Sequence, residues 1–319
     1  MGEPKLKPDP SKKYRLITRS DMDGLVCAVL LKELGIVDDV SFAHPKDMQD
    51  GLIDVDSEVI TTNLPYVPGV YMAFDHHASE ALRVADHPGN HIIDAAAPSA
   101  ARVVYDYFGG EKAFPEISVE MMEAVDKADS AAFSKNDITD AKGWELLSFL
   151  MDARTGLGRF RDFNISNYQL MMKLIETVRE HSSIEEILQM PDVKERVDIY
   201  NAHLPKFKEQ IERCARLHGN LVILDLRRED TIWAGNRFMI YALFPNCNIS
   251  MHAMWGKNKQ NTVLAIGKSI LNRTSKTNVG ELCLSYGGGG HNAAGTCQVD
   301  NLKADEVVQE IIGKINKDG

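Results

Sequence analysis

The sequence predicts an α/β protein in which a first domain with a mostly parallel sheet is joined by a helical linker to a smaller second α/β domain. Short Val- and Ile-rich runs alternate with helical patterns in the first half, a long helical stretch follows, and strand-like runs then return. The length of 319 residues also suggests about two domains. We expect these three parts to span 1–189, 190–219 and 220–319.

The first half contains five apolar runs with strand character, each bounded by Pro, Gly or Asp. The first, "YRLIT" (14–18), leads through "SDMDG" into an amphipathic helix closed by Gly35. The remaining strands are predicted at 40–44, 59–62, 70–74 and 91–94, and further helices at 99–110 and 118–129.

The second half begins with helical patterns from Asn167 onwards. The end of that stretch has the pattern of a connecting helix closed by Gly219, because glycine commonly ends a helix. Strands are then predicted at 221–226, 248–255 and 262–269, and helices at 231–244, 278–286 and 304–315.

The composition narrows the classes of protein. With 44% hydrophobic and 26% charged residues the chain is typical of globular proteins, and no apolar run approaches the roughly 20 residues of a membrane helix. The first residues lack the apolar centre of a secretory signal, and the five cysteines are scattered without a CxxC pair. We therefore expect a cytoplasmic protein with no membrane partner and no thiolate zinc site.

The net charge of −10 bears on the partner. Proteins that track long nucleic acids usually present a basic surface, because neutralising phosphates drives their affinity. An acidic chain can still hold a small anion in a local pocket. If the substrate is a phosphate compound, we expect a short one and no long nucleic acid.

Candidate metal ligands follow the predicted strands of the first domain. Asp21 and Asp23 come directly after the first strand, and a spacing of two on an extended segment would point both side chains the same way, towards neighbouring cations. Asp75, His76 and His77 follow a later strand, and neutral imidazole suits manganese, zinc or iron.

Two further acids, Asp126 and Asp129, lie where a helix is predicted to end, and Asp126 fits a solvated helix end better than a ligand. Each of these motifs alone is also explained by turn or capping residues. Strand ends of a parallel sheet meet at one edge, however, so their joint occurrence in this order favours a two-metal site for phosphoryl transfer.

The segment "SYGGGGHNAAG" (285–295) is the second strong signal. Consecutive glycines are conformationally expensive, and they make sense where backbone amides approach an anion closely. His291 follows at once and can donate to phosphate, and Arg273 upstream is a natural bidentate phosphate ligand. A flexible linker is the alternative, but the glycines lead straight into small residues and a strand.

Taken together, "SDMDG", "DHH" (75–77), "ADSAAF" (128–133) and "GGGGH" (287–291) resemble the DHH/DHHA1 phosphoesterase superfamily. Its members include bacterial nano-RNases, cyclic-dinucleotide phosphodiesterases, the RecJ exonuclease and proteins labelled exopolyphosphatase. The resemblance covers most of the chain. It implies a DHH catalytic domain, a linker helix and a DHHA1 substrate-binding domain.

The resemblance also implies site roles. It implies two Mn²⁺ ions, with Mg²⁺ as an alternative, an Asp75 that orients His76, and a His77 close to the attacked phosphate. The metal ligands that it implies are Asp21, Asp23, His76 and Asp129. The substrate-holding groups that it implies are Arg273, Gly288, Gly289, Gly290 and His291.

Two positions depart from the family pattern. Arg19 precedes Asp21 where many members carry a histidine or an acid, and Asn63 stands where an aspartate usually bridges the metals. An amide oxygen can ligate a hard cation, but without charge it bridges poorly. The second metal site, formed by Asp23, His76 and Asp129, is complete, whereas the first is left with Asp21 and Asn63, and Arg19 is a further candidate for holding substrate.

We therefore expect a Mn²⁺-dependent phosphodiesterase of the 3′–5′ oligoribonuclease type. It would hydrolyse very short 5′-phosphorylated oligoribonucleotides, dinucleotides such as pGpG, to mononucleotides. One alternative is a hydrolase of polyphosphate or another phosphoanhydride. Another is a nucleotide-binding protein that has lost catalysis, since an arginine beside a weakened metal site could replace a cation's charge. A homodimer is left open.

Overall fold

The computed structural model describes residues 6–9, 11–84, 86, 88–160, 162–180 and 183–319. The chain forms two units. The first comprises Met1–Ala132, Lys142–Ala153 and Phe160–Asp198, and the second comprises Phe133–Ala141, Arg154–Arg159 and Ile199–Gly319. Two short segments of the first half thus belong to the second unit, which a linear division of the chain does not anticipate. The assignment of 1–189, 190–219 and 220–319 to a DHH domain, a linker and a DHHA1 domain stays a prediction.

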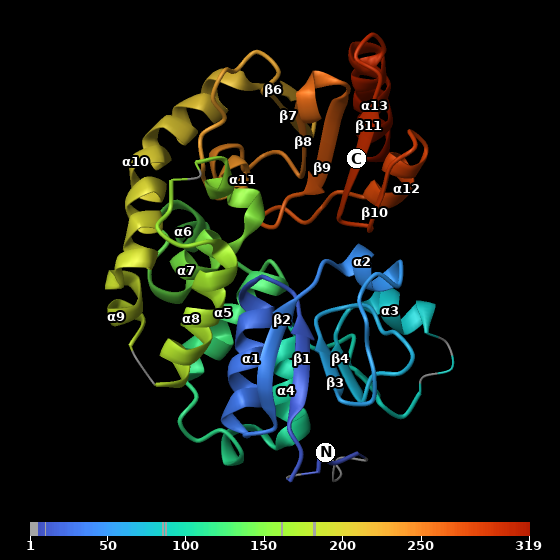
Figure 1. Cartoon of the computed structure of the whole chain (residues 1–319). Coiled ribbons are helices and arrows are strands. Elements are labelled where there is room, and N and C mark those ends of the chain that lie inside the picture. Colours follow the sequence, from blue (N-terminus) through green and yellow to red (C-terminus); the bar gives the residue numbers. More distant parts are fainter. Residues whose placement is uncertain (1–5, 10, 85, 87, 161, 181–182) are drawn as a thin grey trace. The chain divides into compact units, whose positions relative to one another are not determined.

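The first unit is built on a parallel five-stranded sheet with the order β2-β1-β3-β4-β5 (Figure 1). The α/β fold class is as predicted. The order reverses between β1 and β3, and such a switch point is where open α/β sheets bind ligands, at the carboxyl ends of the strands. The strands are β1 (Tyr14–Thr18), β2 (Val37–Phe42), β3 (Val59–Thr62), β4 (Met72–Asp75) and β5 (His91–Ile93).

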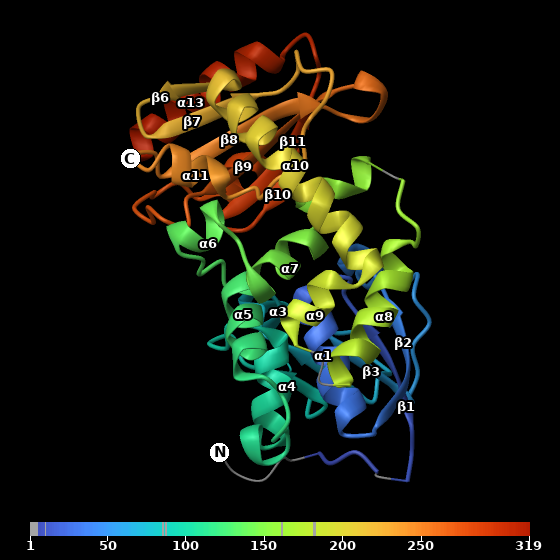
Figure 2. The ribbon, with the colours of Figure 1, turned by 90° about the vertical axis from the view of Figure 1, so that its left-hand side faces the viewer.

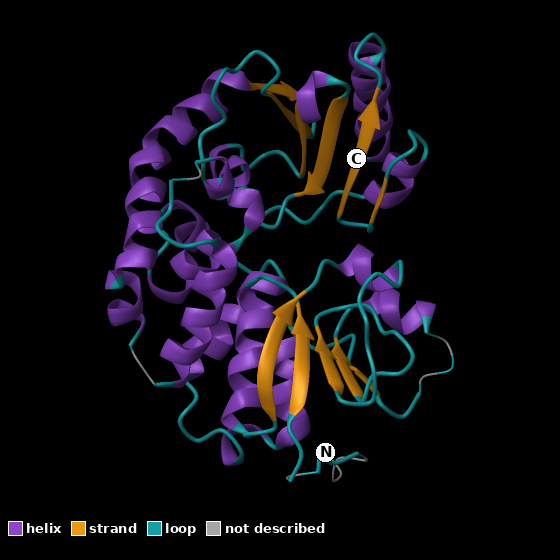
Figure 3. Ribbon diagram, viewed as in Figure 1, coloured by secondary structure: helices purple, strands orange, loops and turns teal. Residues whose placement is uncertain are grey.

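Helices cover this sheet, as the colouring by secondary structure in Figure 3 shows. The helix after β1 contacts three others, which pack around it. The helices of this unit are α1 (Met22–Glu33), α2 (Pro45–Gln49), α3 (Ala78–Arg83), α4 (Ala100–Phe108), α5 (Val119–Asp129), α7 (Gly143–Met151), α8 (Asn167–Arg179) and α9 (Ile184–Gln189).

The amphipathic helix predicted after β1 is instead buried on all its faces. Every residue of α1 from Met22 to Leu31 is buried, because α4, α5 and α8 contact it and the sheet lies beside it (Figure 1). The expectation of an amphipathic helix was therefore wrong. Its predicted end is confirmed, since Gly35 adopts a φ of 67°, in the left-handed region that favours glycine.

The second unit carries a mixed six-stranded sheet with the order β10-β11-β9-β8-β7-β6 (Figure 2). Strands β7 and β8 are parallel, and the other pairs are antiparallel. Its core lies between the sheet and α12 and α13. The strands are β6 (Ala215–His218), β7 (Leu221–Asp225), β8 (Ile249–Trp255), β9 (Thr262–Lys268), β10 (Gly289–Gly290) and β11 (Ala294–Val299). The helices are α6 (Lys135–Thr139), α11 (Met239–Leu243), α12 (Val279–Leu284) and α13 (Ala304–Asp318).

The helix expected to end at Gly219 ends earlier. Helix α10 (Pro191–Cys214) passes from the first unit into the second and stops at Cys214, after which 215–218 form β6. Strand β6 pairs antiparallel with β7, and Gly219, with a φ of 63°, makes the turn between them. Gly219 is thus a hairpin glycine, because pairing with β7 outweighs the helical propensity of 215–218.

The helix predicted at 231–244 is reduced to α11. Two contacts with α10 hold the start of this segment out of helical geometry. The backbone nitrogen of Trp233 donates to the side chain of Gln210 at 3.1 Å, and Gly235 lies so close to Phe207 that an added Cβ would come within 2.0 Å of its ring. Tertiary contacts therefore override the local pattern. In the part of the chain that the structure describes, no helix combines the length and the apolar character needed to cross a membrane.

Candidate metal site

The turn from β1 into α1 presents two aspartates. Asp21 is the N-cap of α1, and its Oδ1 accepts a hydrogen bond from the backbone nitrogen of Gly24 at 3.0 Å. Asp23 lies in the first turn and is buried, and its two oxygens accept hydrogen bonds from the backbone nitrogens of Ala100 at 3.0 Å and Ala101 at 2.7 Å. These amides begin α4, whose positive end stabilises the carboxylate.

Gly24 explains why this turn is so tight. A Cβ at this position would lie 1.9 Å from the carbonyl oxygen of Arg19 and 2.8 Å from the hydroxyl of Thr18. Only glycine therefore allows β1 to pass directly into α1, and the turn places Asp21 and Asp23 at the carboxyl edge of the sheet.

His76 and Asp129 complete a cluster with Asp23. The Nε2 of His76 lies 2.6 Å from Oδ2 of Asp129, the last residue of α5, and its Nδ1 lies 3.2 Å from the carbonyl oxygen of Ala97. Asp23, His76 and Asp129 each offer one ligand atom, and these atoms lie within 4.8 Å of one another. Two oxygens and one imidazole nitrogen suit a divalent cation such as Mn²⁺.

The electrostatics of this cluster fit a bound divalent cation. Burial raises the pKa of Asp23 well above its usual range, and the charges of Asp129 and Asp21 raise it further. Burial also opposes ionisation of Asp129, but its hydrogen bond with His76 outweighs this and lowers the pKa of Asp129. Burial likewise lowers the pKa of His76, but Asp129 and Asp23 outweigh it and raise that pKa to about 9. A divalent cation would relieve the repulsion between the two acids.

An unpaired atom beside His76 points the same way. Oδ2 of Asp75 is buried, and within the described part of the chain it has no hydrogen-bond partner. Buried acceptors are rarely left without a partner in folded proteins. The donor chemistry of this edge of the sheet therefore fits a bound cation.

Asp75 holds the ring of His77 rather than that of His76. The side chain of Asp75 is only 1% exposed. Its Oδ1 lies 2.7 Å from Nδ1 of His77. The same oxygen accepts a hydrogen bond from the backbone nitrogen of His76 at 2.8 Å, but the ring of His76 contacts Ala97 instead. The expectation that Asp75 orients the ring of His76 therefore differs from the structure, because the His76 ring is already engaged by Ala97 and Asp129.

Arg19, Asp21 and Asn63 form a separate group beside the cluster. The Nε of Arg19 lies 3.0 Å from Oδ2 of Asp21, and Nδ2 of Asn63 donates to Oδ1 of Asp21 at 3.1 Å. Asn63 is buried and has a φ of 54°. Of the predicted ligands, the structure thus brings together Asp23, His76 and Asp129, while Asp21 contacts Arg19 and Asn63.

Asp126 has a structural role and is not among the converging ligands, as expected, but the expectation of a solvated helix end was wrong, because its side chain is only 18% exposed. Its Oδ1 accepts a hydrogen bond from Ser99, the N-cap of α4, at 2.7 Å, and its Oδ2 lies 2.7 Å from Nη2 of Arg102. Asp126 therefore fastens α5 to the start of α4. Sequence reasoning did not identify this role of Ser99, although a serine at a helix start is a usual N-cap.

The glycine-rich segment forms a hairpin in the second unit. Gly289 and Gly290 are β10 and pair with Thr296 and Gly295 of β11. A Cβ at Gly288 would lie 2.1 Å from the carbonyl oxygen of Thr296, and one at Gly290 would lie 2.3 Å from that of Ala294. Packing against β11 therefore accounts for Gly288 and Gly290.

Gly289 has no such packing reason, because among the described residues nothing lies within 4 Å of an added Cβ. His291 and Arg273 are both exposed, and Nε of Arg273 donates to the carbonyl oxygen of Ile270 at 3.1 Å. The roles of these residues in holding substrate stay predictions.

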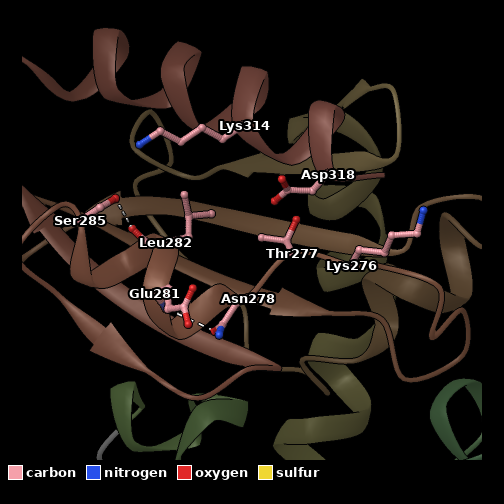
Figure 4. A pocket seen from close by; sticks show the side chains of 8 residues that line it. All are labelled: Lys276, Thr277, Asn278, Glu281, Leu282, Ser285, Lys314 and Asp318. Atoms are coloured by element: carbon pink, nitrogen blue, oxygen red, sulfur yellow. Dashed lines mark hydrogen bonds between the residues drawn. The ribbon is translucent and has the colours of Figure 1, made fainter.

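A hollow of about 430 Å³ in the second unit was not anticipated from the sequence (Figure 4). Its walls carry Lys276 and Lys314 together with Glu281 and Asp318, so the charges of its lining are mixed. The residues that line it are Lys276, Thr277, Asn278, Glu281, Leu282, Ser285, Lys314 and Asp318. This set is different from the predicted substrate-holding residues.

Comparison with known structures places the chain among phosphoesterases. It is similar to the pGpG-specific phosphodiesterase PggH from Vibrio cholerae, with 60% sequence identity, 96% of this chain and 100% of that chain covered, and a TM-score of 0.87. An exopolyphosphatase-related protein from Bacteroides fragilis shares the fold at 13% identity, with 96% of this chain and 93% of that chain covered and a TM-score of 0.53. No protein-family model matches the chain, and no curated protein sequence matches it.

Proposed function

The chain belongs to the DHH family of phosphoesterases, and from this premise we propose that it is a metal-dependent phosphodiesterase that hydrolyses pGpG and similar 5′-phosphorylated dinucleotides to mononucleotides. The observation that carries the proposal is the convergence of Asp23, His76 and Asp129 at the carboxyl edge of the parallel sheet. The name of the relative from Vibrio cholerae, 60% identical over 96% of this chain, supports the substrate class.

Asp23, His76 and Asp129 would hold the cation, which we propose to be Mn²⁺, with Mg²⁺ as the alternative. When bound, the ion supplies a water of lowered pKa and positive charge at the phosphoryl group. The chain's own residues prepare these ligands. The amides of Ala100 and Ala101 fix Asp23, and the carbonyl of Ala97 fixes the ring of His76.

Asp75 and His77 form the second part of the proposed site. Asp75 accepts from Nδ1 of His77, which leaves Nε2 of His77 as the nitrogen that faces substrate. His77 is 34% exposed, so its ring can reach a phosphate. We assign His77 the catalytic role of donating a hydrogen bond or a proton to the phosphoryl group or the leaving 3′ oxygen. Asp75 is its positioning residue.

The second unit would hold the rest of the substrate. We assign this role to the exposed side chains of Arg273 and His291 and to Gly289, where the space that a side chain would fill is open among the described residues. An arginine fork recognises phosphate oxygens well, and a glycine lets a ligand approach the backbone closely. A net charge of −10 disfavours long RNA as a substrate, because long RNA needs many cationic contacts.

The test is hydrolysis of 5′-labelled RNAs of increasing length from the dinucleotide upwards, including pGpG, by the full chain with Mn²⁺, with inorganic polyphosphate in parallel. We expect cleavage of dinucleotides. Asp129→Asn should abolish it, whereas Glu123→Gln, an exposed acid on the same helix α5, should leave it unchanged.

Two outcomes would contradict the proposal. Release of phosphate from polyphosphate without RNA cleavage would favour a phosphoanhydride hydrolase. Tight binding of pGpG by the wild-type chain without cleavage of either substrate would favour a nucleotide-binding protein that has lost catalysis.

A further inference from the structure

We propose that this site binds one divalent cation, and that the guanidinium of Arg19 supplies the second positive charge, binding a phosphate oxygen of the substrate directly. The inference about the phosphate rests on the proposed function, whereas the number of cations does not. It follows from the contacts of Asp21, Asn63 and Arg19.

Asp21 is already engaged at both carboxylate oxygens. Its Oδ1 accepts from the backbone nitrogen of Gly24 at 3.0 Å and from Nδ2 of Asn63 at 3.1 Å, and its Oδ2 lies 3.0 Å from Nε of Arg19. A cation bound at Asp21 would therefore lie close to the fixed positive charge of Arg19. Like charges at such a distance repel, so this carboxylate is a poor second site.

Asn63 does not share a ligand position with Asp21. Its amino group faces Asp21, so its Oδ1 is the atom on the opposite side of the amide and is buried without a partner among the described residues. The φ of 54° also gives asparagine a backbone reason to stand here, because asparagine tolerates the left-handed region better than most residues. Asn63 thus acts as a donor to Asp21 and not as a bridging ligand.

The converging ligands suffice for one ion. Within the described ranges, two groups of three acid or imidazole ligands converge: Asp23 with His76 and Asp129, and Asp75 with His76 and His77. They share His76, and in the second group Nδ1 of His77 is held by Asp75 at 2.7 Å. Asp21 belongs to neither group.

Arg19 is placed to act as the second positive group. Its side chain is 37% exposed, so the part of the guanidinium that does not face Asp21 can meet a substrate. A guanidinium binds phosphate through parallel hydrogen bonds and cannot be deprotonated, so it gives a permanent charge without a second metal.

The first experiment counts metal ions. The full chain is dialysed against Mn²⁺ without substrate, bound manganese is measured by elemental analysis, and the electron paramagnetic resonance spectrum is recorded. We expect one Mn²⁺ per chain and the spectrum of an isolated ion. Two tightly bound ions, or the spectrum of a coupled pair, would overturn the proposal.

The second experiment changes the two positions. The double variant Arg19→Gln/Asn63→Asp removes the guanidinium and adds a carboxylate beside Asp21, and we expect it to take up a second Mn²⁺. If its stoichiometry stays at one, Arg19 and Asn63 do not set the number of ions, which counts against the proposal.

The third experiment tests the phosphate contact. Arg19→Gln should raise KM for pGpG roughly ten- to a hundredfold, the usual effect of losing a charged hydrogen bond, with one Mn²⁺ still bound. Arg15→Gln is the matched control, because Arg15 lies on β1, the strand that Arg19 directly follows, and pairs with exposed Asp56. An unchanged KM in Arg19→Gln would refute the phosphate contact. A wild-type chain that binds one Mn²⁺ but does not cleave pGpG would refute the proposed function and leave the metal count intact.

Discussion

His77 shows at the residue scale how a side chain can serve the reaction without holding the metal. Its ring is fixed by Asp75 at 2.7 Å, and His76 rather than His77 joins Asp23 and Asp129. We therefore expect His77→Gln to lower kcat by about 10²-fold or more, the usual contribution of a positioned acid or base. Bound Mn²⁺ should stay the same.

The control for this prediction is His44→Gln, since His44 caps the short helix α2 and contacts none of these residues in its described hydrogen bonds. The measurements are kcat for pGpG and the amount of bound Mn²⁺, determined for both variants. Loss of Mn²⁺ from His77→Gln would show that His77 is a ligand, through the alternative group with Asp75 and His76.

Residue identities and spacing predicted that acids and histidines meet at one edge of the sheet, and the family resemblance then selected Asp23, His76 and Asp129 as one site. Each follows a strand end or a helix end, and strand ends of a parallel sheet meet at one edge. The partner of Asp75 could not be predicted, because the choice between His76 and His77 depends on which way each ring turns. Side-chain rotamers are set by tertiary contacts, which a list of residues does not contain.

At the scale of elements, two neighbouring glycines of the β10–β11 hairpin are expected to differ: Gly288 is needed for packing, whereas Gly289 is a candidate for binding substrate. We expect Gly288→Ala to destabilise the second unit by about 1–3 kcal/mol, because its Cβ would overlap the backbone of β11. Gly289→Ala should fold with nearly wild-type stability, since its Cβ meets none of the described residues within 4 Å. Thermal unfolding and KM for pGpG, measured on both variants, test this. Equal stabilities would show that the hairpin is not packed as described.

A buried arginine anchors the start of helix α10. Arg196 is 2% exposed, its guanidinium lies 4.1 Å from the ring centre of Phe163, and it donates to the carbonyl of Ile165 at 2.8 Å and to Asn167 at 3.2 Å. Arg196→Met would leave these acceptors unpaired, so we expect a loss of about 2–4 kcal/mol in the free energy of unfolding.

Lys194→Met is the comparison for Arg196→Met. Lys194 forms an exposed pair with Asp198 on the same helix, and exposed pairs contribute about 0.5 kcal/mol or less. Urea unfolding of both variants gives the two free energies. A similar loss of unfolding free energy in both variants would mean that the buried contacts of Arg196 contribute no more than an exposed ion pair.

Elements with a strong local pattern were predictable, and those defined by partners were not. The strands at 14–18 and 59–62 were confirmed with both ends correct. Strand β6 was assigned to a helix because its pairing with β7 is a contact across a turn. Helix α1 was wrongly expected to be amphipathic. The helices that bury it, α4, α5 and α8, lie far along the chain, so its own residues do not reveal its burial.

For the whole molecule, the net charge of −10 predicts how binding responds to salt. A dinucleotide carries few phosphates, so KM for pGpG should change little between low and physiological ionic strength. A long single-stranded RNA should be a weak competitor at either salt concentration. Strong inhibition by such RNA that disappears on adding salt would instead indicate a long basic path.

The cluster also has a consequence for how the first unit assembles. Asp23, His76 and Asp129 come from the start of α1, the end of β4 and the end of α5, so their atoms meet only after the segments between them have folded. An ion that binds all three acts as a late cross-link between distant parts of the chain. Such an ion binds the native state alone, and at a hundred times its Kd it would add about 2.7 kcal/mol to stability. Manganese should therefore raise the melting temperature of the wild-type chain and leave that of Asp129→Asn unchanged. The melting temperature would then report directly on occupancy of the site.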